Sequence, residues 1–308
     1  MAWRIHLTAQ AVNHLYILPG KKPVLAAWSR PNRVEYYDLN TGTLLGDFKV
    51  PESPNGGKRT SDVWEDFIST LKGPDDATYL PVVQTKNTTI YTTDDGKLRL
   101  YRVYDNELYV QTEGREIKLD PGNAERFVSV DLDRALGMIV ALDEQGKIHV
   151  YQQDMRLGAF DVGLSPNELT RSSVVVSRGG GSIFASDGHK LVLTDSSGTV
   201  RKSLPTYYLV SRLACSPNGG MLATSDAESG VIRIYHGESL VPTHQKFAID
   251  LVAKATQIQL LADLPPLDTV ARALTVHAKG VVAFAMSGVV CVTDVSEMDE
   301  LPRPRKLL

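Results

Sequence analysis

The sequence repeats one short pattern six times, and this repetition restricts the possible folds more than any single motif does. In each copy, a turn rich in Gly, Asp, Asn or Ser is followed by an alternating strand with an aromatic residue or Thr near its end. An apolar run precedes every turn, so each copy predicts a β-hairpin. The six copies are Ser29–Asn40, Thr93–Tyr104, Asp143–Asp154, Ser186–Ser197, Glu228–Ser239 and Met286–Glu297.

The spacing of the copies predicts the architecture. The residues that begin the second strand of each hairpin are 64, 50, 43, 41 and 58 residues apart: Arg33, Lys97, Lys147, Lys190, Val231 and Val289. The three middle spacings match the ~40–50 residues of a β-propeller blade, which is a four-stranded antiparallel sheet. Apolar runs before the hairpins and more polar runs after them supply the other two strands. We therefore predict an all-β, six-bladed β-propeller in one domain, residues 1–308, with seven blades as the alternative.

The two ends of the chain predict how the ring closes. Trp3–Leu7 alternates like a strand and has no partner of its own nearby in the sequence. The last unit ends with Pro302 and Pro304, which cannot donate ladder hydrogen bonds and suit a central or outer strand badly. We expect Trp3–Leu7 to be the outer strand of the last blade.

The fifth unit, Ser211–Ser239, carries a family resemblance. Ser216-Pro217-Asn218-Gly219 stands where a WD40 repeat has its Ser-Pro-Asp-Gly turn, and Ile232–His236 ends the third strand. The unit resembles a degenerate WD40 repeat, which implies a propeller that binds proteins. No unit opens with Gly-His, and the Trp of the WD dipeptide is replaced in every unit, so the family's Asp–His–Ser/Thr–Trp network cannot form intact. The replacing residues are Tyr37, Tyr101, Tyr151, Thr194, Tyr235 and Thr293.

Two long spacings indicate insertions, at about residues 51–76 and 248–273, and both are expected to be partly helical. Each lies between the outer strand of one blade and the inner strand of the next, so both should emerge on the face that carries the b–c turns, the turns between second and third strands. Three roles are open for them: plugging the channel or capping a blade edge, binding a partner, or forming a lid over an active site. For partner binding, the residues expected to contact the partner are Trp64, Phe67, Ile68, Leu71, Leu260 and Leu261.

Signals for catalysis are weak. The seven histidines are scattered, and no zinc-protease, nucleophile-elbow or phosphate-loop motif is present, so no cofactor or metal is expected. Cys215 and Cys291 both alternate with apolar residues and are expected to be small buried side chains. A metal-dependent, lactonase-like hydrolase remains the alternative, because such sites draw single ligands from several blades; candidates here are Asn13, Asp131 and Asn218.

Charge and hydropathy narrow the range of partners. Lys and Arg total 33 against 36 Asp and Glu, a net charge of -3, which disfavours a nucleic-acid reader. No apolar stretch is long enough for a membrane span, and the first ten residues lack an apolar signal-peptide core, so a cytoplasmic location is expected. The function that these observations favour is a non-catalytic scaffold or complex subunit that binds a protein or peptide on the insertion-bearing face.

Overall fold

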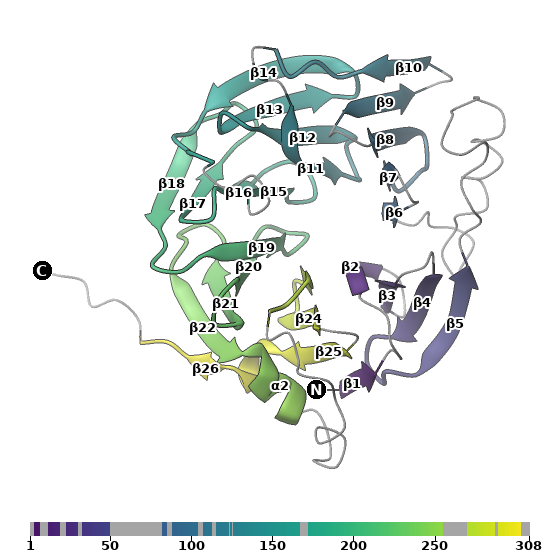
Figure 1. The fold of residues 1–308 in the computed structure, drawn as a ribbon, viewed down its shortest axis with the longest axis vertical. Helices are drawn as coiled ribbons and strands as arrows, with labels where there is room; N and C mark the ends of the chain where they lie inside the picture. Colours follow the sequence, from purple (N-terminus) through teal and green to yellow (C-terminus); the bar gives the residue numbers. More distant parts are fainter. Residues whose placement is uncertain are drawn as a thin grey trace, which may run out of the picture.

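Six antiparallel sheets form a closed ring around a central channel, so the chain folds as a six-bladed β-propeller (Figure 1). The all-β class and the blade number that the repeats predict are confirmed. The computed structural model describes residues 3–6, 12–18, 23–29, 33–49, 82–84, 88–103, 107–112, 115–122, 124, 126–166, 172–254, 270–286 and 289–302.

The first three blades follow the chain from the inner strand outwards. Blade 1 contains β2 (Val12–Leu18), β3 (Val24–Ser29), β4 (Arg33–Asp38) and β5 (Leu44–Lys49). Blade 2 contains β6 (Val82–Gln84), β7 (Thr88–Thr92), β8 (Leu98–Val103), β9 (Leu108–Thr112) and β10 (Arg115–Lys118). Blade 3 contains β11 (Phe127–Asp133), β12 (Met138–Asp143), β13 (Lys147–Gln152) and β14 (Met155–Asp161).

The other three blades complete the ring. Blade 4 contains β15 (Ser173–Val176), β16 (Ile183–Ser186), β17 (Lys190–Thr194) and β18 (Val200–Pro205). Blade 5 contains β19 (Val210–Cys215), β20 (Met221–Asp226), β21 (Val231–His236), β22 (Pro242–Phe247) and β26 (Asp299–Glu300). Blade 6 contains β23 (Ala273–Val276), β24 (Val281–Met286), β25 (Val289–Asp294) and β1 (Trp3–His6).

The N-terminal strand closes the ring, as the sequence predicts. β1 pairs antiparallel with β25, with Trp3 opposite Val292 and His6 opposite Val289. The Trp3 indole donates a hydrogen bond to the Leu39 carbonyl of blade 1 (2.8 Å), so this residue also ties blade 6 to the next blade. Residues from the two ends of the chain thus share one sheet, and β1 covers the edge of β25 that would otherwise be unpaired.

Apolar packing between neighbouring blades holds the ring together. Six clusters of buried side chains each join two consecutive blades, and together they cover all six junctions. Successive side chains of a strand point to opposite faces, and strands such as β12, β16 and β24 are buried along nearly their whole length, so apolar residues cover both faces of the blades. Phe184 and Phe284, for example, are fully buried between blades 4 and 5 and between blades 5 and 6.

Blade 2 contains one strand more than predicted. The turn between β7 and β8 carries Asp94, whose carboxylate is 3.1 Å from Arg134 and 3.0 Å from Arg178. Those arginines lie in the turns that join the first and second strands of blades 3 and 4. β7 contacts the inner strand β11 of blade 3, and apolar residues of β8 and β9 pack against blade 3 as those of the second and third strands of blade 4 pack against blade 5. The four strands that correspond to the other blades are therefore β7 to β10, and β6 is an additional strand at the channel (Figure 1).

This extra strand corrects one assignment. The turn in Thr93–Tyr104 joins β7 and β8, the first two of the four strands that correspond to the other blades, whereas the repeat pattern predicted the second and third. The turn chemistry agrees: Leu98 N–H donates to Thr93 Oγ1 (3.1 Å), just as Met221 N–H donates to Ser216 Oγ (2.9 Å) in the equivalent turn of blade 5. The residue of blade 2 that corresponds to the other third-strand tyrosines is therefore not Tyr101.

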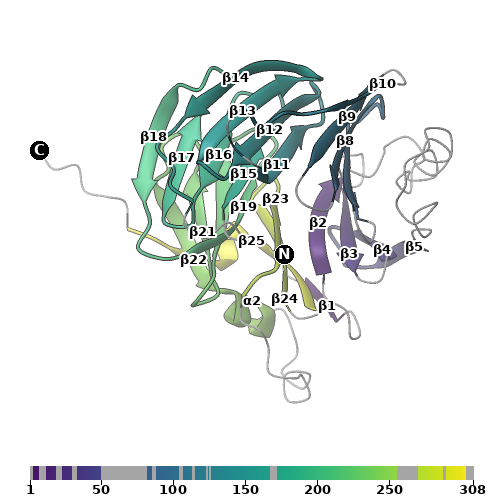
Figure 2. The same cartoon turned by 45° about the horizontal axis from the view of Figure 1, so that its top comes forward.

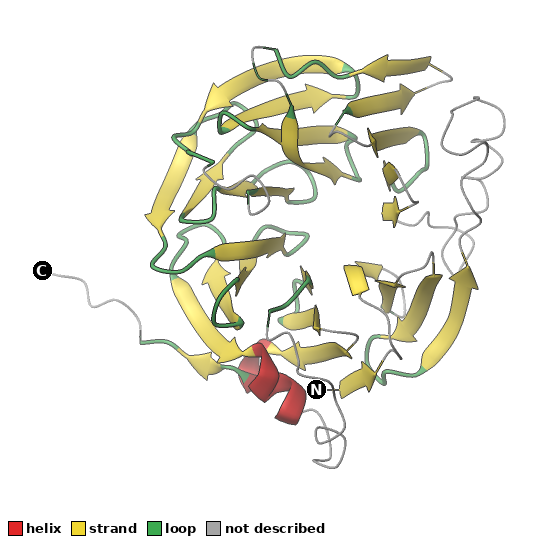
Figure 3. Cartoon of the chain, in the orientation of Figure 1, coloured by secondary structure: helices red, strands yellow, loops and turns green. Residues whose placement is uncertain are grey.

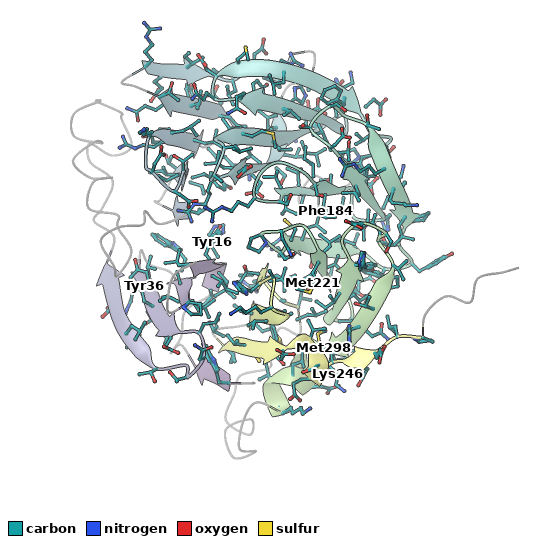
Figure 4. All side chains as sticks on the ribbon, turned by 180° about the vertical axis from the view of Figure 1, so that it is seen from behind. Tyr16, Tyr36, Phe184, Met221, Lys246 and Met298 are labelled. Atoms are coloured by element: carbon teal, nitrogen blue, oxygen red, sulfur yellow. The ribbon has the colours of Figure 1, made fainter. Side chains whose placement is uncertain are left out.

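The C-terminal segment also differs from expectation. β26 pairs with the outer strand β22 and makes blade 5 five-stranded, with Glu300 opposite His244 and Asp299 opposite Gln245. Lys246 of β22, labelled in Figure 4, donates to the Asp299 carboxylate at 2.9 Å. Pro302 follows this strand directly, so the prolines limit its length without preventing it.

The part of the chain that the structure describes contains one α-helix, α2 (Ala248–Lys254), at the start of the second insertion (Figure 3). Ala248, Leu251 and Val252 of this helix are buried in the cluster between blades 5 and 6. This part of the insertion therefore caps a blade junction. The two partly helical insertions are thus confirmed only for this short helix, and residues 51–76 lie outside the described residues. No described helix has the length and hydrophobicity needed to cross a lipid bilayer.

Candidate functional site

The ring has two distinct faces. The inner strands β2, β11, β15, β19 and β23 surround the channel (Figure 2). The starts of these strands line one cavity, and their ends line a second cavity together with the end of β7, so the inner strands all run in the same direction. The outer strands β5 and β22, after which the two insertions begin, end at the face where the inner strands start. We call this the insertion side. The turns between first and second strands define the opposite face, which we call the turn side.

The insertion-side mouth of the channel opens into a cavity of about 750 Å³. This volume is within the range of ligand pockets in proteins. Four arginines from blades 2, 3, 5 and 6 line the cavity: Arg102, Arg126, Arg212 and Arg272. Asp131 is the one carboxylate residue among its described lining residues. Arg126 pairs with Glu144 at 3.2 Å, but cationic side chains still outnumber carboxylates among the described residues of this mouth, although the whole chain is weakly acidic.

The turn-side mouth is smaller, about 350 Å³, and its charges are balanced. Arg134 and Arg178 both contact the carboxylate of Asp94. Burial lowers the pKa of Arg134, and the charge of Asp94 opposes this shift. Because Asp94, Arg134 and Arg178 come from blades 2, 3 and 4, this cluster connects three neighbouring blades.

Four residues line both cavities and so lie where the two cavities meet: Tyr16, Val176, Cys215 and Thr275. Figure 4 shows Tyr16 near the middle of the ring, whereas Tyr36 lies further out on the same blade. Burial raises the pKa of the Tyr16 hydroxyl, and burial together with the nearby Asp131 raises that of the Cys215 thiol. Cys291 is fully buried, as predicted, but Cys215 is only partly buried because it faces the channel.

Asp131 connects two inner strands. Val176 N–H of β15 donates to its Oδ2 at 2.8 Å, and Leu132 N–H donates to its Oδ1 at 2.9 Å. Ser129, two residues earlier on β11, accepts from Val174 N–H at 3.1 Å. Inner strands expose backbone groups to the channel, and these two side chains satisfy such groups on β15. Despite the hydrogen bonds, burial raises the pKa of Asp131 to about 7.

The predicted partner-contact residues lie outside the described residues, so their positions remain predictions: Trp64, Phe67, Ile68, Leu71, Leu260 and Leu261. The candidate metal ligands are only partly described. Asp131 lines the insertion-side cavity, whereas Asn218 lines the turn-side cavity, and the side chain of Asn13 is not described. Asn218 also accepts hydrogen bonds within its own turn, from Ser216 Oγ at 2.7 Å and Gly220 N–H at 3.1 Å. Among the described residues, no three His, Cys, Asp or Glu side chains are grouped so that they could hold a metal ion.

Two exposed aromatic residues lie on the insertion side. Tyr207 is in the connection between blades 4 and 5, and its side chain is fully exposed, at 104% of the reference area. Its neighbour Thr206 donates a backbone hydrogen bond to His189, in the b–c turn of blade 4, which places this connection on the insertion side. Phe247 ends β22 on the same face and is about half exposed.

Comparison of the sequence with models of protein families, and with curated protein sequences, finds no match.

Sequence reasoning did not single out the arginines of the insertion-side mouth. Arg126 and Arg272 each stand directly before an inner strand, and Arg212 lies near the start of another. The sequence therefore contained one indication of this arginine cluster, namely an arginine near the start of three inner strands. Its meaning depended on knowing that these strand starts meet at one end of the channel.

Proposed function

We propose that this protein is a non-catalytic interaction module that binds a protein or peptide partner on the insertion side. The observation that carries the proposal is the fully exposed side chain of Tyr207 on that face. Tyrosine is enriched among interface residues because it buries a large area and keeps a hydroxyl for hydrogen bonding. The half-exposed Phe247 and the open channel mouth on the same face support the same conclusion.

The finer parts of this proposal come from the sequence. The fifth unit resembles a WD40 repeat, and propellers of that kind often act as scaffolds or complex subunits. Trp64, Phe67, Ile68 and Leu71 of the first insertion, with Leu260 and Leu261 of the second, would extend the contact surface. The lactonase-like alternative requires several carboxylate or amide ligands around one point, and the described residues contain no such group of acidic or histidine side chains.

Tyr207 offers a clean test, because a side chain that contacts little can be removed without disturbing the fold. Affinity capture from a native lysate should recover a partner with the wild-type protein and lose it with Tyr207→Ala. Leu136→Ala is the matched control, because Leu136 is 53% exposed in a turn-side loop of blade 3. The double variant Trp64→Ala/Phe67→Ala tests the first insertion in the same assay. If the partner binds Tyr207→Ala and Leu136→Ala equally well, Tyr207 is no part of the interface and the proposal loses its main support.

A further inference from the structure

The insertion-side mouth holds an arginine that no carboxylate neutralises. Arg212, on β19, donates from Nε to the Arg272 carbonyl and from Nη1 to the Ser211 carbonyl, both at 2.8 Å. It forms no ion pair with any described residue, and its charged neighbour is another cation, Arg272. Burial and that like charge lower the pKa of Arg212, so the site would gain stability from a bound negative charge.

Two unpaired hydroxyls lie in the wall of the same cavity. Ser172 and Ser173 begin the inner segment of blade 4, next to β19, and both line the cavity. Their Oγ atoms are buried and have no hydrogen-bond partner within the described part of the chain. Ser172 is only 6% exposed. A buried hydroxyl without a partner is costly, and an acceptor entering the cavity would satisfy it after rotation of the side chain.

The carboxylate in this cavity, Asp131, already accepts hydrogen bonds from the backbone. Asp131 lines the cavity, but each of its oxygens accepts a backbone N–H, from Leu132 and from Val176. At the turn-side mouth, by contrast, Arg134 and Arg178 share Asp94 directly. The two ends of one channel thus differ: the arginines of one are neutralised within the protein, whereas Arg212 at the other is not.

From these contacts we propose that the insertion-side mouth binds a carboxylate of an acidic peptide, held by the Arg212 guanidinium and the hydroxyls of Ser172 and Ser173. A guanidinium matches a carboxylate with two parallel hydrogen bonds. The cavity is much larger than a single small anion and opens on the face that carries Tyr207, which favours a peptide side chain or C-terminus over a free ion. This proposal rests on the proposed function, and it specifies the chemistry of the partner.

Fluorescence anisotropy with a labelled glutamate-rich peptide tests the site directly. We expect the wild-type protein to bind the peptide and Arg212→Gln to bind it at least roughly tenfold more weakly, as expected for loss of a charge-assisted hydrogen bond. Arg115→Gln is the control, because it removes the same charge from an exposed position on the outer strand β10. Equal weakening by both variants would show a non-specific charge effect and overturn the proposal. Ser172→Ala should weaken binding less than Arg212→Gln does.

Competition separates the possible sources of the anion. Unlabelled glutamate-rich peptide should displace the probe at concentrations at which inorganic phosphate does not. If phosphate or an RNA oligonucleotide binds through Arg212 and the peptide does not, the peptide assignment is wrong. Arg212→Lys keeps the charge but loses the planar fork, so it should weaken binding by an intermediate factor and carries the test if Arg212→Gln does not fold.

The outcome for the site and the outcome for the function can be told apart. If a partner is lost with Tyr207→Ala but no acidic peptide binds the channel, the interaction module is supported and the carboxylate site is refuted. If the peptide binds through Arg212 but no partner depends on Tyr207, the carboxylate site is supported and the proposed docking face is refuted.

Discussion

Replacing Asp131 by Asn should change how the stability of the propeller depends on pH. Burial raises the pKa of Asp131 to about 7 in the folded protein, against 3.8 for the ordinary side chain. The folded state therefore holds this proton more tightly than the unfolded state does. Because the folded state binds more protons between these two values, the free energy of unfolding falls as the pH rises from about 4 to about 7.

The shift sets the size of the effect. One pKa unit corresponds to about 1.4 kcal/mol, so the complete shift would correspond to about 4 kcal/mol. Asp131 is partly exposed to the channel, where water stabilises its charged form. We therefore expect the ionisation of Asp131 to reduce the free energy of unfolding by about 2 kcal/mol between about pH 5 and about pH 8. Asn cannot ionise, and its amide oxygen can still accept the hydrogen bond from Val176 N–H.

The assay is urea unfolding of wild type and Asp131→Asn at both pH values, followed by tryptophan fluorescence. The stability of the variant relative to wild type should increase by about 2 kcal/mol from the lower to the higher pH. His277, whose pKa is lowered by burial and by Lys279, acts with the opposite sign in this window, but it is present in both proteins and cancels in the comparison.

Asp95→Asn is the control variant, because the pKa of Asp95 shifts in the opposite direction on folding. Burial by itself would raise the pKa of Asp95, but hydrogen bonds from Lys97 N–H and the Thr93 hydroxyl outweigh it and lower this pKa. The stabilisation that ionised Asp95 gives to the folded state is therefore lost only as the pH falls below 3.8. Asp95→Asn should therefore change stability equally at the two pH values. If the difference between Asp131→Asn and wild type is also the same at both, the argument from burial of Asp131 is refuted.

Three substitutions test the packing of the ring. Gly146→Ala should cost about 3 kcal/mol, because φ at this position is +85° and an added Cβ would lie 2.3 Å from the Leu164 carbonyl oxygen; an unchanged urea midpoint would contradict this. Trp3→Ala should cost about 3 kcal/mol and should increase hydrogen exchange in β25, because the hydrogen bond to Leu39 and the packing at the ring closure are lost; unchanged exchange in β25 would show that β1 does not stabilise the closure. Tyr208→Phe should cost about 1 kcal/mol in thermal or urea unfolding, because its hydroxyl bonds two other buried hydroxyls; a more stable variant would show that these bonds give no net stabilisation.

The blades were predictable because their signals are local. Alternation of apolar residues, turn residues such as Asp143 to Gly146, and the spacing between copies all act over fewer than about 50 residues. Ring closure followed from the same kind of signal, since Trp3–His6 has the pattern of a strand but no local partner.

The second blade shows where a local signal becomes ambiguous. Turns between first and second strands, and between second and third, both use polar residues and a glycine with positive φ, as Gly96 and Gly146 show. The pattern therefore identified a hairpin at Thr93–Tyr104 but not its place within the blade. That place is decided by contacts between blades, namely the apolar packing of β8 and β9 against blade 3, and the ion pairs of Asp94 with Arg134 and Arg178 agree with it.

The sequence by itself determined the class of fold, the number of blades and the way the chain ends meet, because strand alternation and turn chemistry are properties of neighbouring residues. Only the tertiary structure decided which side chains share the channel. Ser172, Arg212 and Arg272 are far apart in the chain and have no characteristic spacing, and they meet because each lies near the start of an inner segment in a neighbouring blade. Their charge balance was also invisible in the sequence, since it depends on Asp131 accepting two backbone hydrogen bonds instead of pairing with an arginine.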